Sequence, residues 1–270
     1  MTQPDHALMM FVQGFIGQAV MYFAVVGVFY LVLWKWGAAR WKEARIQPKR
    51  RVDAKQIAFE IKNTLIVLLV GAPITFSISM LYASGATKLT TDAATIGWPI
   101  IAATFAGLLV FNDAWFYCWH RLLHHPKLFR HVHAVHHRSV DVNPFSSYSF
   151  HWFEGLVLGA WVLPAALIVP MYLPMLGLLS GIGLINNVMS HLGYEFFPRA
   201  LLRVPLLRWI NTSTFHNLHH TNFKGNYGLM FRFWDRLLGT ELPNYEATFL
   251  QRGRQRQAAG QNTAHGVARS

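Results

Sequence analysis

Apolar residues are concentrated in four long stretches, at about 8–34, 64–83, 93–117 and 156–189, separated by polar segments. A transmembrane helix needs about 20 predominantly apolar residues, so each of the first three stretches predicts one spanning helix. The fourth is too long for one crossing and is interrupted by Pro164, Pro170 and Pro174. It therefore predicts a hairpin of two helices, which either both cross the membrane or form a re-entrant pair. The pattern as a whole predicts an all-α, integral membrane helical bundle with about three to five membrane segments.

The basic residues predict the orientation of this bundle. All but one of the 24 Lys and Arg residues fall on one side of the membrane in this arrangement, and the exception, Lys88, follows the second stretch. The positive-inside rule places the basic side in the cytoplasm, so we expect the N-terminus outside and the C-terminus inside. A net charge of +12 is also typical of nucleic-acid-binding proteins, but the long apolar stretches argue against that class. We attribute the charge to a cytoplasmic face next to anionic lipid.

The chain is expected to form one membrane domain over residues 1–248. Residues 249–270 are rich in Gln, Arg and Ala and lack an apolar pattern, which predicts a disordered basic tail. The first apolar stretch is too long for a signal peptide and no basic residues precede it, so we expect it to remain as an anchor. The single cysteine, Cys118, excludes an internal disulfide, a CxxC zinc site and a Cys-ligated iron–sulfur cluster.

Histidines form the strongest chemical signal in the sequence. Of the 14 histidines, all except His6 and His265 lie in or beside the predicted cytoplasmic segments. Two HxxHH motifs begin at His133 and His216, and an HxxxH motif begins at His120 where the third apolar stretch ends. Residues three or four apart share a helix face, so each HxxHH motif is expected to aim up to three imidazoles at one point. Neutral imidazole binds iron, copper, nickel and zinc, and this many imidazoles indicate two metal ions. We therefore expect a cytoplasmic, helical, histidine-rich metal domain.

Other interpretations of the histidines remain open. Isolated surface or core histidines do not explain two HxxHH motifs and an HxxxH motif in one short chain. A membrane zinc hydrolase needs a general base such as the Glu of HExxH, but no Asp or Glu lies inside these motifs. A bis-His haem protein is a further alternative, although it needs far fewer histidines at helical spacing than this chain contains. A non-catalytic membrane metal-binding or transport protein is also compatible with the pattern.

The order of these motifs resembles the fatty acid hydroxylase/sterol desaturase superfamily. The motifs are HRLLHHP from His120, HAVHH from His133, NVMSH from Asn187 and HNLHH from His216. Two further segments are similar to the sterol C5-desaturase branch, and these are PFSSYSFHWFEG from Pro144 and NYGLMFRFWDRLLGT from Asn226. The resemblance extends from about Gln56 to Thr240.

This resemblance implies an O2-dependent di-iron oxidoreductase. Its cofactors would be two Fe²⁺ ions, which zinc can replace in overexpressed preparations, with O2 as co-substrate. Its reaction would hydroxylate or desaturate a C–H bond of a fatty-acyl, sterol-like or polar lipid. The sequence shows no flavin, haem or iron–sulfur module, so an external electron donor is expected, such as cytochrome b5 or ferredoxin with its reductase. No nucleic-acid partner is expected.

The resemblance also implies a ligand set. It comprises His120, His133, His136, His137, His191, His216, His219 and His220. The first histidine box is the motif HRLLHHP from His120. For its second ligand, helical spacing favours His124, whereas the pattern of fatty-acid 2-hydroxylases favours His125. We slightly prefer His125, because Pro126 ends the helix and lets that side chain turn inward.

Several further residues near the motifs have open roles. Asn187 stands where fatty-acid 2-hydroxylases have His, and it either completes one metal site or makes an interhelical hydrogen bond. Four carboxylates are candidates for orienting the ligands or for ordinary ion pairs and caps, and these are Asp113, Asp141, Glu154 and Asp235. The roles of His131 and His151 stay open.

Overall fold

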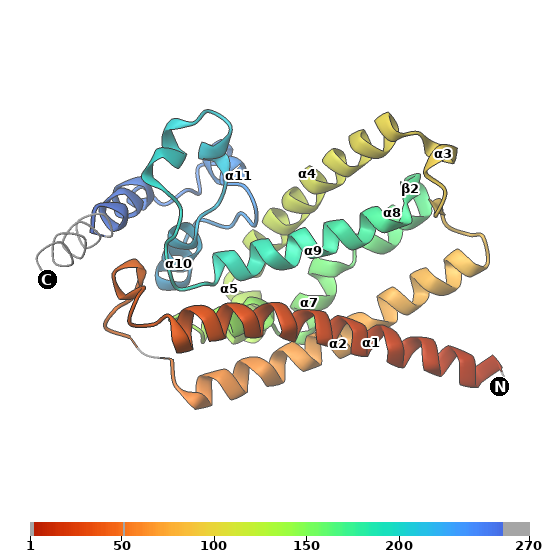
Figure 1. Cartoon of the computed structure of the whole chain (residues 1–270), viewed down its shortest axis with the longest axis horizontal. Coiled ribbons are helices and arrows are strands. Elements are labelled where there is room, and N and C mark those ends of the chain that lie inside the picture. Colours follow the sequence, from red (N-terminus) through yellow and green to blue (C-terminus); the bar gives the residue numbers. More distant parts are fainter. Residues whose placement is uncertain (1–2, 51, 256–270) are drawn as a thin grey trace, which may run out of the picture.

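The computed structural model describes residues 3–50 and 52–255, which are mostly helical with two very short strands (Figure 1). The helices that precede the first HxxHH box are α1 (Gln3–Phe29), η1 (Tyr30–Trp36), η2 (Lys42–Ala44), α2 (Ala54–Ala83), α3 (Ala93–Ile96), α4 (Trp98–Leu123) and α5 (Pro126–Leu128). The remaining helices are η3 (Phe129–His133), α6 (Ala134–His137), η4 (Pro144–Tyr148), α7 (Trp152–Gly159), α8 (Val162–Ile168), α9 (Leu173–Ser190), η5 (Arg199–Arg203), η6 (Leu207–Trp209), α10 (Ser213–Asn222) and α11 (Phe233–Leu237). The strands are β1 (Leu89–Thr90) and β2 (Met171–Tyr172).

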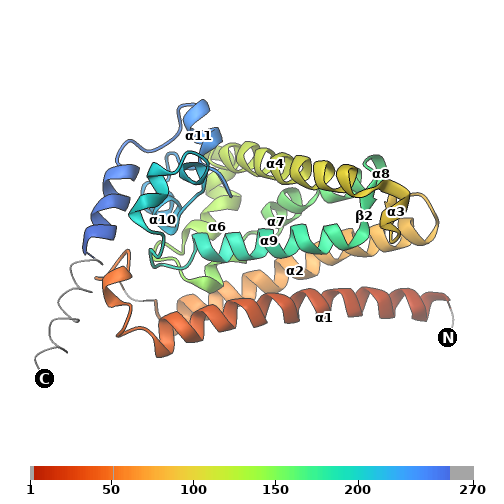
Figure 2. The ribbon, with the colours of Figure 1, turned by 45° about the horizontal axis from the view of Figure 1, so that its top comes forward.

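Long apolar helices form a membrane bundle, as predicted. Within the described residues, four segments are long and apolar enough to cross a membrane, and these are Leu8–Trp36, Ala54–Ala83, Trp98–Leu123 and Leu173–Ser190. α1 and α2 lie side by side and run in opposite directions (Figures 1 and 2). α3 and β2 lie at the end of the bundle where the chain begins, and α10 lies at the other end (Figure 2). The histidine-bearing segments therefore share one end of the bundle.

The fourth apolar stretch forms the predicted hairpin. Its first arm is the shorter apolar segment Trp152–Ile168, made of α7 and α8, and its second arm is α9. The turn between the arms reaches the loop that follows α2, because β1 pairs in parallel with β2 and places Leu89 opposite Met171. The backbone N–H of Lys88 also donates to the carbonyl oxygen of Ala166 at 2.9 Å. Both arms thus extend from the histidine end to the Lys88 end.

Three boundaries differ from the prediction. α2 begins at Ala54, whereas its apolar stretch begins at about residue 64. The helix starts at a cap in which the Asp53 side chain accepts a hydrogen bond from the backbone N–H of Gln56. α4 begins only at Trp98, because Gly97 adopts a φ of 84° that interrupts the helix before it, and α4 then extends past residue 117 to carry His120. Residues 245–255 are helical and Phe249 is buried, so residue 249, where we expected the tail to begin, lies inside a helix. Residues 256–270 of the expected tail lie outside the described residues.

Buried carboxylates fasten the histidine end to the membrane helices. Glu60 of α2 accepts hydrogen bonds from Ser139 Oγ at 2.6 Å and Asn143 Nδ2 at 2.8 Å, and so holds the loop after α6. Asp113 of α4 accepts from the backbone N–H of Met230 at 2.7 Å, and so holds the segment after α10. A buried carboxylate is tolerated where such hydrogen bonds compensate for lost hydration. These contacts make the histidine end a continuation of the bundle.

The orientation of the bundle can be tested with cysteine labelling. In a Cys118→Ser background, Ala86→Cys reports on the loop after α2 and Gln251→Cys on the C-terminal helix; both positions are exposed. We expect a membrane-impermeant maleimide to label Ala86→Cys in intact cells, and to label Gln251→Cys only after lysis, because the basic residues belong inside. Labelling of Gln251→Cys in intact cells would show that the bundle has the opposite orientation to the one predicted.

Candidate metal centre

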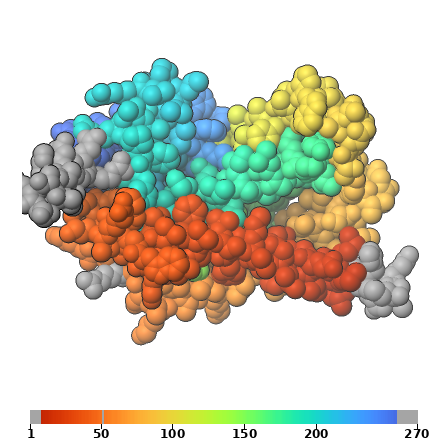
Figure 3. All heavy atoms as spheres, in the orientation of Figure 1, coloured from red at the N-terminus to blue at the C-terminus, as the bar shows by residue number. Residues whose placement is uncertain are grey.

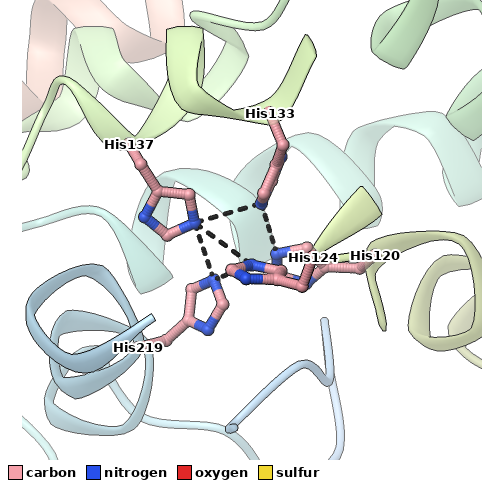
Figure 4. A group of neighbouring side chains, drawn as sticks. All are labelled: His120, His124, His133, His137 and His219. Atoms are coloured by element: carbon pink, nitrogen blue, oxygen red, sulfur yellow. Dashed lines mark hydrogen bonds between the residues drawn. The ribbon is translucent and has the colours of Figure 1, made fainter. Parts of the chain in front are cut away.

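Nine histidines converge in two neighbouring groups. In each group, one ring nitrogen from every residue lies within 4.8 Å of the others. The first group, shown in Figure 4, consists of His120, His124, His133, His137 and His219. The second group consists of His136, His191, His216 and His220. All nine are buried except His124, which is half-buried. The two groups lie against each other, since the ring centres of His137 and His220 are 4.7 Å apart.

The spacing of the ring nitrogens matches metal coordination. Nε2 of His137 lies 3.0 Å from Nε2 of His133 and 3.1 Å from Nε2 of His219. Nε2 of His216 lies 3.0 Å from that of His191 and 3.1 Å from that of His220. Ligand nitrogens about 2.1 Å from one ion lie about 3.0 Å apart in octahedral geometry and about 3.4 Å apart in tetrahedral geometry. The described residues therefore fit two metal ions, one per group.

Each HxxHH box is shared between the two groups. His133 and His137 belong to the first group, and His136, between them in the sequence, belongs to the second. In the last box the assignment is reversed, because His216 and His220 belong to the second group and His219 to the first. The prediction that each box aims at one point is therefore wrong. The first and last histidines of a box are four residues apart and belong to one group, whereas the histidine three residues after the first belongs to the other group.

Backbone carbonyl groups orient several rings. Nδ1 of His120 donates to the carbonyl oxygen of Tyr227 at 2.7 Å, and Nδ1 of His219 donates to that of Gly225 at 2.7 Å. Nδ1 of His191 donates to the carbonyl oxygen of Asn187 at 2.8 Å. A carbonyl oxygen only accepts, so Nδ1 carries the proton in each ring and the Nε2 lone pair faces the group centre. This is the tautomer that a metal ligand needs.

The loop that supplies two of these carbonyls has an unusual backbone. Gly225 has a φ of 123°, and a Cβ at this position would lie 2.4 Å from the carbonyl oxygen of Thr240. The side chain of Asp235 accepts from the backbone N–H groups of Tyr227 and Gly228 at 2.8 and 2.7 Å. Glycine is the residue that fits such a position. Sequence reasoning missed these ligand-orienting carbonyls, and the only local signal was the Gly225-Asn226 pair, which favours a left-handed backbone.

One carboxylate contacts a clustered histidine directly. Glu154 is buried at the start of α7, and its Oε1 accepts from Nδ1 of His133 at 2.7 Å. A carboxylate in this position fixes the ring and increases the basicity of the ligand nitrogen. Of the other candidates, Asp235 holds the Gly225–Tyr227 loop, whereas Asp113 holds the backbone of Met230 and Asp141 pairs with Arg45.

Burial keeps the clustered imidazoles uncharged. Loss of hydration lowers the pKa of His216 well below its usual value, and the neighbouring imidazoles of His191 and His219 lower it further. Burial likewise lowers the pKa of His219. The rings therefore remain neutral at physiological pH, and neutral imidazole is the form that binds metal.

The structure separates the histidines whose roles were open. His124 ends α4 with helical dihedral angles and joins the first group, whereas His125 is extended, exposed and outside both groups. Our preference for His125 is therefore corrected in favour of His124. His131 is exposed and its ring accepts from Arg130 Nε, while His151 caps α7 by accepting from the backbone N–H of Phe153.

Asn187 is buried beside the second group. Its Nδ2 donates to the carbonyl oxygen of Ser147 at 2.7 Å, which is an interhelical contact of the kind we considered. This hydrogen bond gives Asn187 a structural role. A contribution of its Oδ1 atom to one metal site stays a prediction.

Comparison with protein families accounts for this arrangement. The fatty acid hydroxylase family model matches residues 105–240, which include all nine clustered histidines and half of the chain. The chain belongs to the fatty acid hydroxylase family.

Two of three individual relatives carry names that refer to sterols. Methylsterol monooxygenase 1 of Gallus gallus is 33% identical over 144 residues, which cover 53% of this chain and 48% of the relative. The Delta(7)-sterol 5(6)-desaturase ERG3B of Gibberella zeae is 27% identical over 198 residues, 73% of this chain and 60% of the relative. Protein CER1-like 2 of Arabidopsis thaliana is 32% identical over 199 residues, 71% of this chain and 30% of the relative. The chain thus spans about half the length of the methylsterol monooxygenase that it matches. No solved structure matches it.

Alanine substitutions in the first box of this fatty acid hydroxylase family member should separate His124 from His125. His124→Ala should release metal from the first group, because it removes one of five converging nitrogens. His125→Ala should keep full metal content, because that side chain is exposed. Elemental analysis of the purified proteins measures both, and metal loss in His125→Ala with retention in His124→Ala would reverse our assignment.

Replacement of the carboxylate that contacts His133 should weaken metal binding. Glu154→Gln keeps an acceptor near His133 Nδ1 but removes the charge, so we expect metal affinity to fall by about 10- to 100-fold. Competition with a chelator measures the affinity. Glu43→Gln, at an exposed glutamate on the same side of the membrane, serves as the control and should behave like the wild type. Equal affinity for Glu154→Gln and wild type would show that Glu154 does not tune the ligand.

Proposed function

We propose that this chain is a membrane di-iron oxidoreductase that uses O2 to hydroxylate or desaturate a C–H bond of a lipid. The observation that carries the proposal is the pair of adjacent nitrogen groups, one of five and one of four histidines, at the end of a membrane bundle. We propose these nine residues as the ligands of the two ions. The family and the names of its members support oxidation of a lipid C–H bond.

Iron is the metal that we propose for this chemistry. Two bound ferrous ions would supply electrons to O2 and generate the oxidant that removes hydrogen from an unactivated carbon. The imidazole set is also suitable for zinc, so zinc should replace iron in some preparations without supporting turnover. The protein's own contribution is to hold the rings through Tyr227, Gly225 and Glu154, and to keep water away from the buried groups.

An apolar cavity gives a lipid access to this site. It has a volume of about 470 Å³ and is lined by residues of α1, α2, α4, α7, α8 and α9. Figure 3 shows a hollow between α1, α2 and α9 on one face of the molecule. Two lining residues touch the metal ligands, since Phe116 packs on His120 with ring centres 5.1 Å apart and Phe150 packs on His136 at 4.7 Å. A lipid that enters between the helices therefore reaches both groups.

Electrons would come from a separate protein on the cytoplasmic side. The histidine end carries the basic loops of the predicted topology, and such a surface attracts acidic partners by electrostatic steering. Cytochrome b5 or a ferredoxin with its reductase is suitable for this role. The same surface also attracts anionic lipid headgroups.

Lipid analysis with isotopically labelled O2 tests the proposed reaction. Iron-loaded protein supplied with a reductase, an electron carrier and a membrane lipid extract should form a product with one labelled oxygen or one additional double bond. His133→Ala should form none, whereas His131→Ala should match the wild type because His131 is exposed and lies outside both groups. Fully reduced, iron-loaded protein that consumes no O2 and changes no lipid would favour a metal-binding or transport role.

A further inference from the structure

Among the described residues, one amide side chain in the wall of the cavity has no hydrogen-bond partner. Asn112 lies near the middle of α4 and lines the cavity. Within the described residues, no hydrogen bond to its amide is found. An amide at membrane depth is unfavourable unless it is hydrogen-bonded, and water is scarce there. Unpaired polar groups in membrane helices therefore point to a ligand.

Neighbouring amide and carboxylate side chains are hydrogen-bonded, whereas the hydroxyls of Tyr148 and Ser180 in the same wall are, within the described residues, also unpaired. Asp113 accepts from Met230, and Asn186 Nδ2 donates to the carbonyl oxygen of Leu229 at 3.0 Å. Farther along the cavity, Gln18 Nε2 donates to Thr75 Oγ1 at 3.0 Å. Of these amide and carboxylate side chains, only the amide of Asn112 offers both a donor and an acceptor that the protein leaves unused.

Asn112 lies at the metal end of the cavity. Phe116, one helical turn farther along α4, lines the cavity and packs on His120. Asn187 lines the same cavity four residues before His191, and its Oδ1 atom has no partner among the described residues once Nδ2 binds Ser147. Asn112 precedes His120 by two helical turns, a rise of about 12 Å. A lipid oxygen bound at Asn112 would thus place carbons about 12 Å farther along the lipid beside the metal groups.

The rest of the cavity is suited to an apolar body. Its lining on α9 runs from Leu176 to Asn187, which corresponds to about 17 Å along the helix. Gly71, Gly159 and Gly183 line it, and an added Cβ at any of them would meet nothing within 4 Å. These glycines therefore leave the interior wide. A lipid with one oxygen and a long or bulky hydrocarbon part matches this distribution of polar and apolar surface.

We propose that Asn112 hydrogen-bonds an oxygen of the substrate, so that the cavity selects lipids with a hydroxyl or carbonyl group about two helical turns from the carbon that is oxidised. This inference rests on the proposed function for its biological meaning, but its test is a binding measurement. In this proposal, Asn112 determines which lipids the cavity prefers. A pure hydrocarbon would leave the amide unpaired and bind more weakly.

Matched pairs of lipids test the inference. Purified, metal-loaded protein in detergent is titrated with radiolabelled cholesterol or its 3-deoxy analogue cholest-5-ene, and with 1-octadecanol or octadecane. The wild type should bind the alcohol about tenfold more tightly than the hydrocarbon in at least one pair. Asn112→Leu, which is similar in volume, should bind both members of that pair within about twofold of each other. The pair that shows the preference distinguishes a ring lipid from a chain lipid.

Two control variants separate recognition from packing. Asn112→Gln retains the amide and should keep part of the preference. Asn244→Leu makes the same substitution at an exposed position outside the cavity lining and should keep all of it. A packing defect would weaken both members of a pair equally and leave their ratio unchanged. If Asn112→Leu fails to hold metal, Asn112→Ala replaces it with the same expected loss of preference.

The outcomes decide between the two proposals. A wild type without preference in either pair, or an Asn112→Leu variant that keeps the preference, would overturn the role of Asn112. An intact preference together with absence of any O2-dependent product would contradict the proposed function and leave this inference standing.

Discussion

The mutual approach of nine neutral imidazoles is the interaction on which the rest of this structure depends. Their Nε2 atoms face one another at hydrogen-bond distances, yet where the Nδ1 atoms donate to carbonyls the Nε2 atoms carry lone pairs. Lone pairs that face one another in a buried site repel, and a cation at each centre changes the repulsion into attraction. Metal binding and the order of this end of the molecule are therefore coupled.

The membrane bundle provides the frame for this arrangement. α4 carries His120 and His124 at its end, and His191 directly follows α9. The two HxxHH boxes lie on short helices beyond the bundle, and buried carboxylates such as Glu60 and Asp113 connect the adjoining segments to α2 and α4. The two histidine groups consequently lie where the interior of the bundle meets the end that carries α10, beside a cavity that lies between the membrane helices. In the proposed function, this position would let an apolar substrate reach a polar site without leaving the bilayer.

Much of the fold could be predicted from the sequence because its signals are local. Long apolar stretches predict membrane helices by length alone, and prolines at 164, 170 and 174 predict the hairpin. The histidine boxes identified all nine members of the two groups. Their division could not be predicted, because it depends on how α6 packs against α10. The choice of His124 over His125 depended on a single backbone conformation at the end of α4. The carbonyls of Gly225 and Tyr227 have no side-chain signature, and the helix that contains Tyr245 and Phe249 is held by tertiary packing against Leu201 and Phe215.

The metal-to-protein ratio tests the central claim most directly. Protein purified from iron-supplemented cells and quantified by amino-acid analysis should contain about two transition-metal ions per chain by elemental analysis, one for each nitrogen group. A ratio of one or less in folded protein that converts lipid would contradict the account, because the second group would then be an ordinary cluster of buried histidines.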